Sequence, residues 1–223
     1  MRKFQFGENQ IGHIYNRGVD KRDIFLKETD YLRFLHNMFE LNDNRKHSNV
    51  GYYFKQNQNI EVQPQYFERK PRELLVEILA FVLMPNHYHL ILKQKKENGI
   101  VKFMQKIGTG YTMSFNNKYN RDGSLFQGRF KAVLVDSDPY LVHLLNYIHF
   151  NPLKLPNLNS PNLEGYRWSS FPDYIGKKNF PSITSREFLL NFFGSEEKYR
   201  KEAEEWLKEK DKNTYLIKDI VLE

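Results

Sequence analysis

Two histidines separated by one residue, His87 and His89, are the first candidates for chemistry in this sequence. Alternate side chains of a β-strand project from the same face, so the two imidazoles could bind one metal ion together. A His-x-His pair taken alone is more often structural than metal-binding. This pair, however, follows the strongly apolar segment Leu74–Met84, and imidazoles in such surroundings need polar partners. A metal ion would be one such partner, and it would require a third ligand.

A second candidate group is Tyr147 with Asn151, four residues apart in a segment that has helical spacing. Residues at positions i and i+4 lie one above the other on the same face of an α-helix. The tyrosine offers an oxygen nucleophile, and the asparagine offers a carbonyl oxygen that can bind a hard cation. In the alternative interpretation, Tyr147 is a core aromatic residue and Asn151-Pro152 is an ordinary helix stop.

The apolar pattern predicts the strands that would hold the histidines. Ile11–Val19 alternates loosely and predicts a first strand. Leu74–Met84 and Leu90–Leu92 flank a tight Met-Pro-Asn turn, which predicts a hairpin in the middle of a sheet. Residues 123–135 end in a strand-like Ala-Val-Leu-Val, and Val50–Phe54 is a candidate short strand.

Helical spacing of apolar residues predicts the helices, and Thr29 is the expected N-cap of the first one. Together with the strands they predict an α/β fold, a central antiparallel sheet with helices packed on it. The helices are expected at Asp30–Asn42, Gly99–Tyr119, Asp138–Phe150, Arg186–Phe193 and Glu196–Lys210.

The composition narrows the class of protein. The 223 residues include 34 Lys and Arg against 27 Asp and Glu, a net charge of +7 that suggests an anionic partner. Cysteine is absent, which excludes a disulfide scaffold, a cysteine zinc site and a cysteine nucleophile. The sequence contains no signal peptide and no apolar run approaching the roughly 18 residues of a membrane span. We therefore expect a cytoplasmic protein with no membrane contact.

Positive charge and aromatic residues gather in the same stretch of the chain. Residues 196–223 hold seven basic and nine acidic side chains, so the net positive charge belongs to the body of the protein. Within the body, residues 101–135 carry six basic side chains against Asp122 alone, interleaved with aromatic ones. That mixture suits phosphate tracking and base stacking on unpaired nucleic acid. In the alternative interpretation, the aromatic residues belong to the core and the charges form a solvated face.

Five short motifs occur in order between residues 11 and 174: Asn16-Arg17-Gly18, Met84-Pro85-Asn86-His87-Tyr88-His89, Phe126-Gln127-Gly128-Arg129-Phe130-Lys131, Tyr147-Ile148-His149-Phe150-Asn151-Pro152 and Trp168-Ser169-Ser170. Each motif is weak alone. The ordered set resembles the REP-associated tyrosine transposases, a branch of the single-tyrosine HUH transposases.

The resemblance implies a mechanism. Tyr147 matches the family's catalytic position, so it would attack a DNA phosphodiester and form a covalent 5′-phosphotyrosine, freeing a 3′-OH. His87 and His89 match the metal-ligand pair, and Asn151 matches the position of the third ligand. The implied cofactor is Mg²⁺ or Mn²⁺, which would polarise the scissile phosphate. The covalent link would conserve the phosphodiester, so that the chain can be joined to a new end without ATP.

We expect the DNA contacts among basic side chains of the motifs and of the basic stretch. Arg129 and Lys131 belong to one of the family motifs, and Arg17 follows the first strand. The full set of candidates is Arg17, Lys102, Lys106, Arg121, Arg129 and Lys131.

The resemblance also implies a fold and a domain organisation. The family has a ferredoxin-like, or RRM-like, core, which is compatible with the order of predicted elements. We expect the transposase domain over residues 1–175, with an insertion at residues 55–73, followed by a C-terminal helical extension over residues 176–223.

The function implied is that of a metal-dependent transposase that nicks and rejoins single-stranded DNA, with a hairpin as the expected partner. Two alternatives stay open. One is a non-catalytic protein that binds hairpin DNA, and the other is a metal-dependent nuclease that uses water, with Tyr147 structural. A bacterial protein of this kind would be nucleoid-associated when bound to DNA, and it could act as a monomer or as a homodimer.

Overall fold

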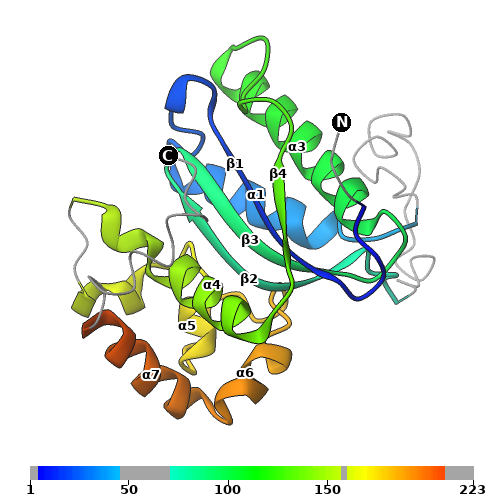
Figure 1. The fold of residues 1–223 in the computed structure, drawn as a ribbon. Coiled ribbons are helices and arrows are strands. Elements are labelled where there is room, and N and C mark those ends of the chain that lie inside the picture. Colours follow the sequence, from blue (N-terminus) through cyan, green and yellow to red (C-terminus); the bar gives the residue numbers. More distant parts are fainter. Residues whose placement is uncertain (1–4, 46–70, 157–159, 209–223) are drawn as a thin grey trace, which may run out of the picture.

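The structure is a computed structural model that describes residues 5–45, 71–156 and 160–208 (Figure 1). The candidate strand Val50–Phe54 and residues 55–70 of the expected insertion lie outside the described residues. Within the three described ranges, no helix is both long and apolar enough to cross a membrane.

Four strands of the described chain form one antiparallel sheet in the spatial order β2-β3-β1-β4. Helix α1 (Glu28–Glu40) follows β1, and helix α3 (Gly99–Tyr119) follows β3, which gives the β-α-β-β-α-β order of the ferredoxin-like fold. The predicted central antiparallel sheet with helices packed on it is confirmed. The strands are β1 Ile11–Arg17, β2 Val76–Met84, β3 His87–Gln94 and β4 Lys131–Val135.

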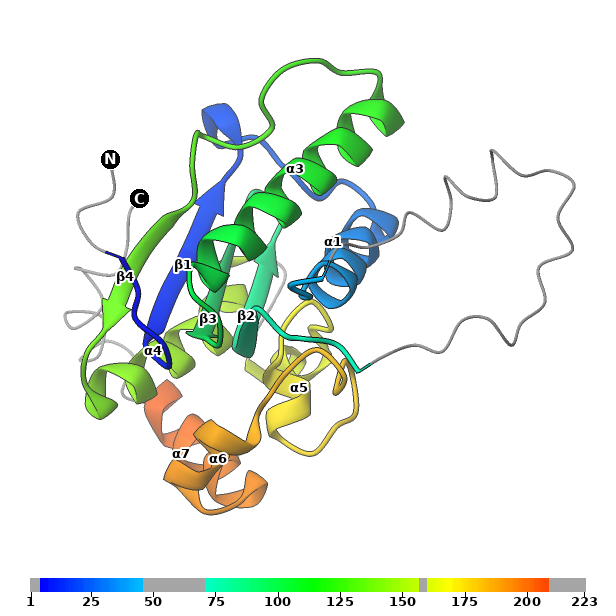
Figure 2. The same ribbon diagram turned by 90° about the vertical axis from the view of Figure 1, so that its right-hand side faces the viewer.

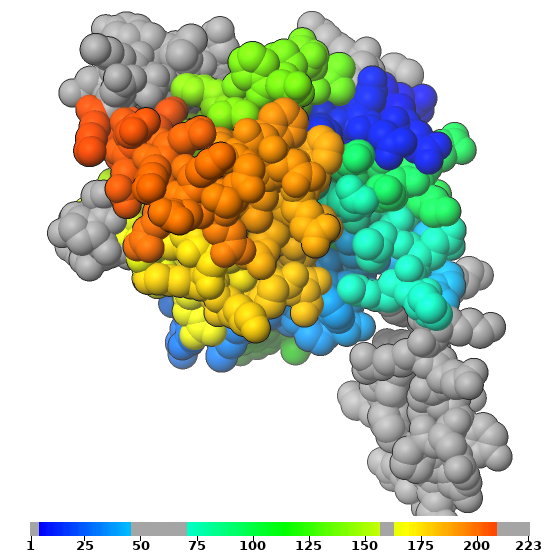
Figure 3. Space-filling view, turned by 90° about the horizontal axis from the view of Figure 1, so that it is seen from below, coloured from blue at the N-terminus to red at the C-terminus, as the bar shows by residue number. Residues whose placement is uncertain are grey.

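Helices cover both faces of the sheet (Figures 1 and 2). α1 and α3 lie on one face, and α4 (Asp138–Phe150) lies on the other. Three further helices pack beyond α4, namely α5 (Phe171–Tyr174), α6 (Glu187–Phe193) and α7 (Glu196–Lys208). Figure 3 shows α6 and α7 side by side on the surface at this end of the molecule. The sheet is therefore the middle layer of three, and it separates two apolar cores.

β2 is buried on both faces, and a β-bulge adapts it to the two cores. Ile78 belongs to the core beneath α1 and α3, whereas Leu79 and Ala80 both belong to the core beneath α4. Ile78 pairs with Leu92 but Ala80 pairs with Ile91, so one residue of β2 is extra. Burial on both faces explains why this segment lacks the simple alternation of a half-buried strand.

The free edge of β2 is covered by the Trp168-Ser169-Ser170 segment. The amide of Leu83 donates to the Trp168 carbonyl at 2.8 Å, and the amide of Phe81 donates to Ser170 Oγ at 2.9 Å. These bonds satisfy backbone groups that an edge strand otherwise exposes. The prediction of a hairpin in the middle of the sheet is thus only half right, because β3 is central while β2 is a covered edge strand.

The C-terminal helices share the core of α4. The buried ring of His149 on α4 hydrogen-bonds the Tyr199 hydroxyl of α7 at 2.6 Å and Ser170 Oγ at 2.8 Å. Leu189 and Phe193 of α6 belong to the same core cluster. The extension therefore supports α4 from behind. The domain boundary near residue 175 stays a prediction.

The start of α1 differs from the prediction. α1 begins at Glu28, so Thr29 lies inside the helix and is not its N-cap. The carboxylate of Asp30 instead accepts hydrogen bonds from the amides of Leu26 and Lys27, each at 2.9 Å. Asp30 is thus the third helical residue of a capping box, and it accepts from the amides of the two residues that precede the helix. The predicted bounds of Gly99–Tyr119 are confirmed for α3.

Candidate active site

The tight turn between β2 and β3 orients His87. The side-chain amide nitrogen of Asn86, Nδ2, donates to the Lys21 carbonyl at 3.2 Å. The atom of Asn86 that faces His87 is therefore the amide oxygen, Oδ1. Asn86 Oδ1 lies 2.6 Å from His87 Nδ1, and because an amide oxygen only accepts, Nδ1 carries the proton. Burial lowers the pKa of His87 to about 4, so the ring is neutral at pH 7 and its Nε2 is a lone pair.

Gly18 lets the chain after β1 reach this turn. Its amide donates to the Asn86 carbonyl at 2.8 Å, and it pairs with Phe126 in an antiparallel bridge. A Cβ atom at position 18 would lie 2.1 Å from the carbonyl oxygen of Arg22, which is far inside contact distance. The glycine of the Asn16-Arg17-Gly18 motif is therefore required by close packing of the backbone.

Tyr147 of α4 meets His89 of β3, and Asn151, the C-cap of α4, meets His87. The rings of Tyr147 and His89 are perpendicular with centroids 5.4 Å apart, and Asn151 Oδ1 lies 3.3 Å from His87 Nε2. The four residues from Tyr147 to Asn151 rise about 6 Å along a helix, and the two residues from His87 to His89 rise about 6.6 Å along a strand. The spacings are nearly equal, so both contacts can form at once when the helix and the strand run in opposite directions. All four side chains come from one chain. The structure thus brings together the predicted nucleophile and the three predicted metal ligands.

A third histidine, His13 of β1, touches this group. His13 Nε2 lies 2.9 Å from His89 Nδ1, and the two rings stack with centroids 5.1 Å apart. The strand register brings them together, because Tyr15 pairs with His89 and His13 pairs with Ile91. Burial lowers the pKa of His13 to about 3 and also holds the pKa of His89 well below its usual value. His13 was not among the residues expected at the site from the sequence, and the structure places it in contact with a candidate ligand.

The three predicted ligands fit a divalent cation. With the proton of His87 on Nδ1, the lone pairs of His87 Nε2 and Asn151 Oδ1 face one another at 3.3 Å, an arrangement that a cation would stabilise. Asn151 Nδ2 is buried and has no hydrogen-bond partner in the described part of the chain. Neutral imidazoles and an amide oxygen suit Mn²⁺ somewhat more than Mg²⁺. The described residues contain no metal-binding cluster of three His, Cys, Asp or Glu side chains, so a site here depends on Asn151.

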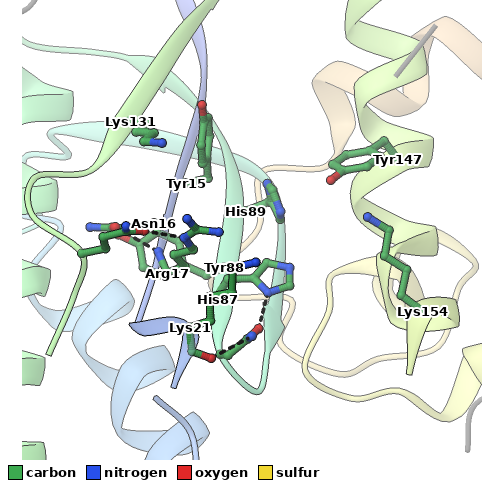
Figure 4. A pocket seen from close by; sticks show the side chains of 12 residues that line it. Tyr15, Asn16, Arg17, Lys21, His87, Tyr88, His89, Lys131, Tyr147 and Lys154 are labelled. Carbon is green, nitrogen blue, oxygen red and sulfur yellow. Dashed lines mark hydrogen bonds between the residues drawn. The ribbon is translucent and has the colours of Figure 1, made fainter. Parts of the chain in front are cut away.

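His87, His89 and Tyr147 line a cleft of about 290 Å³ (Figure 4), and Asn151 is buried behind His87. Four basic side chains line the cleft as well, and none of the described residues around it is acidic. Lys154 Nζ lies 5.1 Å from the centroid of the Tyr147 ring. Figure 4 shows these two on one side of the cleft and His89, Tyr15 and Lys131 on the other. The cleft is therefore positive and suited to an anion. Its basic residues are Arg17, Lys21, Lys131 and Lys154.

Two of the six predicted DNA contacts, Arg17 and Lys131, lie in this cleft. The guanidinium of Arg17 donates to Gln127, which also lines the cleft. Arg129 instead lines a second and larger cavity, which α3 borders. The Phe126–Lys131 segment thus contributes side chains to both cavities.

The other three predicted DNA contacts lie on or just after α3, on the face of the sheet opposite Tyr147. Lys102 is exposed. Lys106 Nζ donates to the Asp43 carbonyl at 2.5 Å, and Arg121 donates to Asn116 Oδ1 at 2.9 Å. The structure does not bring these three to the cleft, and their contact with DNA stays a prediction.

Sequence reasoning missed three cleft residues, Tyr15, Lys21 and Lys154. The ring of Tyr15 stacks on His89 with centroids 5.7 Å apart, and burial raises the pKa of Tyr15. Its position two residues before Arg17 on one strand was a usable signal, because both side chains share a face. Lys154 ends a 3-10 turn that starts at Asn151, and no local pattern indicated where that turn would lead.

The remaining histidines of the described chain lie elsewhere. His143, one turn before Tyr147, does not line the cleft, and its ring lies 5.8 Å from that of Trp206 in α7. His36 is exposed on α1. Neither of these two histidines lines the cleft that holds Tyr147.

Comparison with protein families bears on the same residues. The family model described as transposase, IS200-like, matches residues 36–151. This range is slightly more than half of the chain, and it contains His87, His89, Tyr147 and Asn151. No curated protein matches the sequence.

Among solved structures, the chain is similar to the REP-associated tyrosine transposase bound to a REP hairpin. The TM-score is 0.52 at 16% sequence identity, and the match covers 84% of this chain and 94% of that one. A crystal structure of a transposase candidate from Deinococcus radiodurans R1 matches with a TM-score of 0.35 at 13% identity, over 66% of this chain and 95% of that one. The first similarity indicates a shared fold, and the second is too low to support an inference.

Proposed function

This chain belongs to the IS200-like transposase family, and from that premise we propose that it is a metal-dependent transposase that nicks and rejoins single-stranded DNA through Tyr147. A hairpin is the proposed form of the substrate, because the similar transposase of known structure was bound to one. One observation carries the proposal. Tyr147, His87 and His89 line one cleft that has four basic and, among its described residues, no acidic side chains, and the buried Asn151 lies against His87.

The proposed step is a transesterification. The phenolic oxygen of Tyr147 attacks a DNA phosphorus, an O–P bond forms, and the P–O3′ bond breaks. The phenolic proton leaves to solvent, and the departing 3′ oxygen takes up a proton. The product is a 5′-phosphotyrosine and a free 3′-OH, so the number of phosphodiester linkages is conserved. A 3′-OH that attacks the same phosphorus reverses the step and joins the strand to a new end.

The residues around Tyr147 have separate roles in this proposal. The Lys154 ammonium beside the ring favours the phenolate over the neutral phenol. Arg17 and Lys131 hold the phosphates on either side of the reacting one. His87, His89 and Asn151 hold Mg²⁺ or Mn²⁺, which when bound supplies Lewis-acid polarisation of the phosphate oxygens. The neutral state of both imidazoles suits them to that ligation.

The proposal is tested by trapping the covalent link. The full chain is incubated with Mn²⁺ and end-labelled single-stranded DNA that carries a hairpin, then boiled in detergent and run on a denaturing gel. A labelled band at the mass of the protein plus DNA is expected for wild type. It should be lost when EDTA is added and in the Tyr147→Phe variant.

Tyr15→Phe is the matched control, because Tyr15 is the other tyrosine whose ring contacts His89 in the same cleft. This variant should keep the covalent band. If the band is lost in Tyr15→Phe and retained in Tyr147→Phe, the nucleophile is Tyr15 and our proposal names the wrong residue. Cleavage that survives both substitutions would indicate a nuclease that uses water, and binding without any cleavage would indicate a passive hairpin-binding protein.

A further inference from the structure

A chain of buried polar side chains lies in the core behind α4. It consists of Asn146 and His149 of α4, Tyr199 of α7 and Ser170 beside the edge of β2, and each is at most 4% exposed. The core around them is made of aliphatic and aromatic side chains. Polar groups lower stability there unless all of them are hydrogen-bonded, so their presence calls for a reason. None of the chemistry proposed above uses this chain.

The hydrogen bonds of the chain run in one direction. The buried ring of His149 contacts no carboxylate among the described residues, so it is neutral, and one ring nitrogen donates while the other accepts. The single hydroxyl proton of Tyr199 is donated to Asn146 Oδ1 at 3.3 Å, so Tyr199 accepts from His149 Nδ1 at 2.6 Å. His149 Nε2 then accepts from Ser170 Oγ at 2.8 Å. In the reverse direction Asn146 Oδ1 would lose this donor, so the first arrangement is the satisfied one.

The chain holds α4 from the side away from the cleft. Two residues along an α-helix turn by about 200°, so His149 projects from the side of α4 opposite to Tyr147. Figure 1 shows α4 between the sheet and α7. Asn146 directly precedes Tyr147 in sequence. The chain is thus bonded to α4 on both sides of the proposed nucleophile.

The other end of the chain is fixed to the sheet. Ser170 Oγ accepts from the amide of Phe81 at 2.9 Å, and the amide of Ser170 donates to the Phe81 carbonyl at 3.0 Å. Val82, the next residue of β2, pairs with His89 of β3. Hydrogen bonds therefore link the helix that carries Tyr147 to the sheet at the level of His89.

Hydrogen bonds fix a helix more closely than apolar contacts do. Apolar burial is non-directional, whereas a hydrogen bond requires a particular distance and angle, and a fully satisfied buried network specifies one arrangement of the core. A displacement of a reacting group by about 1 Å can slow a reaction by roughly 100-fold. The directional contacts behind α4 therefore bear on how well Tyr147 can attack.

We infer that His149 and Tyr199 are positioning residues, which hold the phenolic oxygen of Tyr147 at the distance and angle required for attack on the phosphodiester. The inference rests on the proposed function, since it requires Tyr147 to be the nucleophile. It gives α7 a part in the reaction, although none of the described residues of α7 lines the cleft.

Tyr199→Phe and Tyr174→Phe form a matched pair for the test. Both tyrosines are fully buried in the same core, but the Tyr174 hydroxyl donates to the Leu79 carbonyl of β2 at 2.7 Å rather than to α4. Each variant keeps the ring and loses one buried hydroxyl, so both should lower the melting temperature to a similar extent.

The measurement is the rate of covalent adduct formation in a single turnover, with Mn²⁺ and a saturating amount of the full-length protein over the hairpin DNA of the trapping assay. The temperature is kept below the melting temperature of both variants. The rate should fall roughly 10- to 100-fold in Tyr199→Phe and less than about twofold in Tyr174→Phe. Fluorescence anisotropy should give the same DNA affinity for both variants and wild type, because the chain does not contact the cleft.

A second pair of variants tests the histidine. His149→Leu removes both hydrogen bonds of the ring, whereas His149→Asn can still donate to Tyr199 from its amide nitrogen. The adduct rate should fall in His149→Leu and recover in part in His149→Asn. The double variant with His149→Leu and Tyr199→Phe should be no slower than His149→Leu alone, because both changes break the same chain.

The outcomes separate this inference from the proposed function. If Tyr199→Phe slows the adduct no more than Tyr174→Phe, or if weaker DNA binding accounts for the loss, the chain is only structural and the inference is wrong, while the proposed function stands. Additive effects of His149→Leu and Tyr199→Phe on the rate would also overturn it. If wild type forms no adduct, the proposed function fails and this inference fails with it.

Discussion

His13 Nε2 and His89 Nδ1 lie 2.9 Å apart, on neighbouring strands in the middle of the sheet. One of the two nitrogens must carry a proton. When His89 Nδ1 donates, the unprotonated His89 Nε2 has a lone pair that can bind a cation. His13 then accepts at Nε2, so its own proton is on Nδ1. That atom is buried and has no hydrogen-bond partner in the described part of the chain. We predict that His13 is a positioning residue, which by accepting from His89 Nδ1 sets the tautomer of a proposed ligand.

We predict that His13→Phe weakens Mn²⁺ binding by roughly 10- to 100-fold, the usual effect of removing a hydrogen-bond partner from a metal ligand. Phenylalanine keeps a ring between the strands but removes the acceptor for His89 Nδ1. Calorimetric titration of Mn²⁺ into the Tyr147→Phe background measures the change. His36→Phe, at an exposed position of α1, is the control. An unchanged Mn²⁺ affinity in folded His13→Phe would contradict the positioning role.

The affinity for Mn²⁺ is predicted to depend on the side chain at position 151. Asn151→Leu should lower Mn²⁺ affinity by more than about tenfold, because it removes an oxygen ligand, while Asn151→Asp should keep or raise it, because carboxylates are stronger ligands for hard cations. Asn146→Leu, on the same helix, is the control. Its Oδ1 accepts from the Tyr199 hydroxyl at 3.3 Å, so this variant should lose stability rather than metal affinity. Equal Mn²⁺ affinities for Asn151→Leu and wild type would exclude Asn151 as a ligand.

The active site is predicted to function within one chain, because Tyr147 packs against the His89 of its own chain. A mixture of Tyr147→Phe with a His87→Ala, His89→Ala double variant should therefore form no covalent DNA adduct. Each variant mixed with wild type is the control, and should retain the band in proportion to the wild-type share. Recovery of the adduct in the mixture of variants would instead require a dimer in which tyrosine and histidines come from different copies.

The basic residues of the cleft are predicted to act as phosphate contacts. Lys131→Ala and Lys154→Ala should each weaken hairpin DNA binding for all sequences alike, and each should reduce the slope of log affinity against log salt by about one. Lys177→Ala is the matched control, because Lys177 is ion-paired with Glu164 at 2.6 Å on the C-terminal side of the molecule. Binding isotherms at four salt concentrations give the slopes. A sequence-dependent loss would point to base contacts instead.

Acid is predicted to destabilise the metal-free protein. Burial lowers the pKa of His13 and of His149 to about 3 and that of His87 to about 4. Between about pH 4 and pH 6.5 the unfolded chain therefore binds more protons than the folded one, so the free energy of unfolding rises with pH. We expect a loss of at least about 1 kcal/mol on going from pH 7 to pH 5, measured by urea unfolding.

The control for this pH dependence is His36→Asn, which changes a histidine at an exposed position of α1. His149→Gln tests one buried contributor. This variant should be less stable at pH 7, where it loses bonds to Tyr199 and Ser170, and its free energy of unfolding should depend less on pH below 6.5. A pH dependence identical to that of wild type would mean that His149 does not titrate as inferred.

The local elements of this protein could be predicted from its sequence, because they depend on residues that are near neighbours in the chain. The bounds of α3 matched at both ends, and α4 spans the predicted Asp138–Phe150. The same reasoning put His87 and His89 on one face of a strand and Tyr147 and Asn151 on one face of a helix, because the two periodicities are intrinsic to the backbone. Short-range chemistry was less predictable at α1, where the helix begins before Thr29 and Asp30 accepts from the amides of Leu26 and Lys27.

Tertiary structure alone decided how these faces meet. The pairing of Tyr147 with His89 and of Asn151 with His87 depends on the direction in which α4 crosses β3, which the two cores determine together. His13 lies 76 residues from His89 in sequence, and only the register of β1 against β3 joins them. Tertiary structure also decided which basic residues reach the cleft. Strand order places Lys131 of β4 beside it, whereas Lys102 and Lys106 are carried on α3 to the other face of the sheet. Periodicity is a local property of the chain, whereas register and strand order minimise the free energy of the whole core.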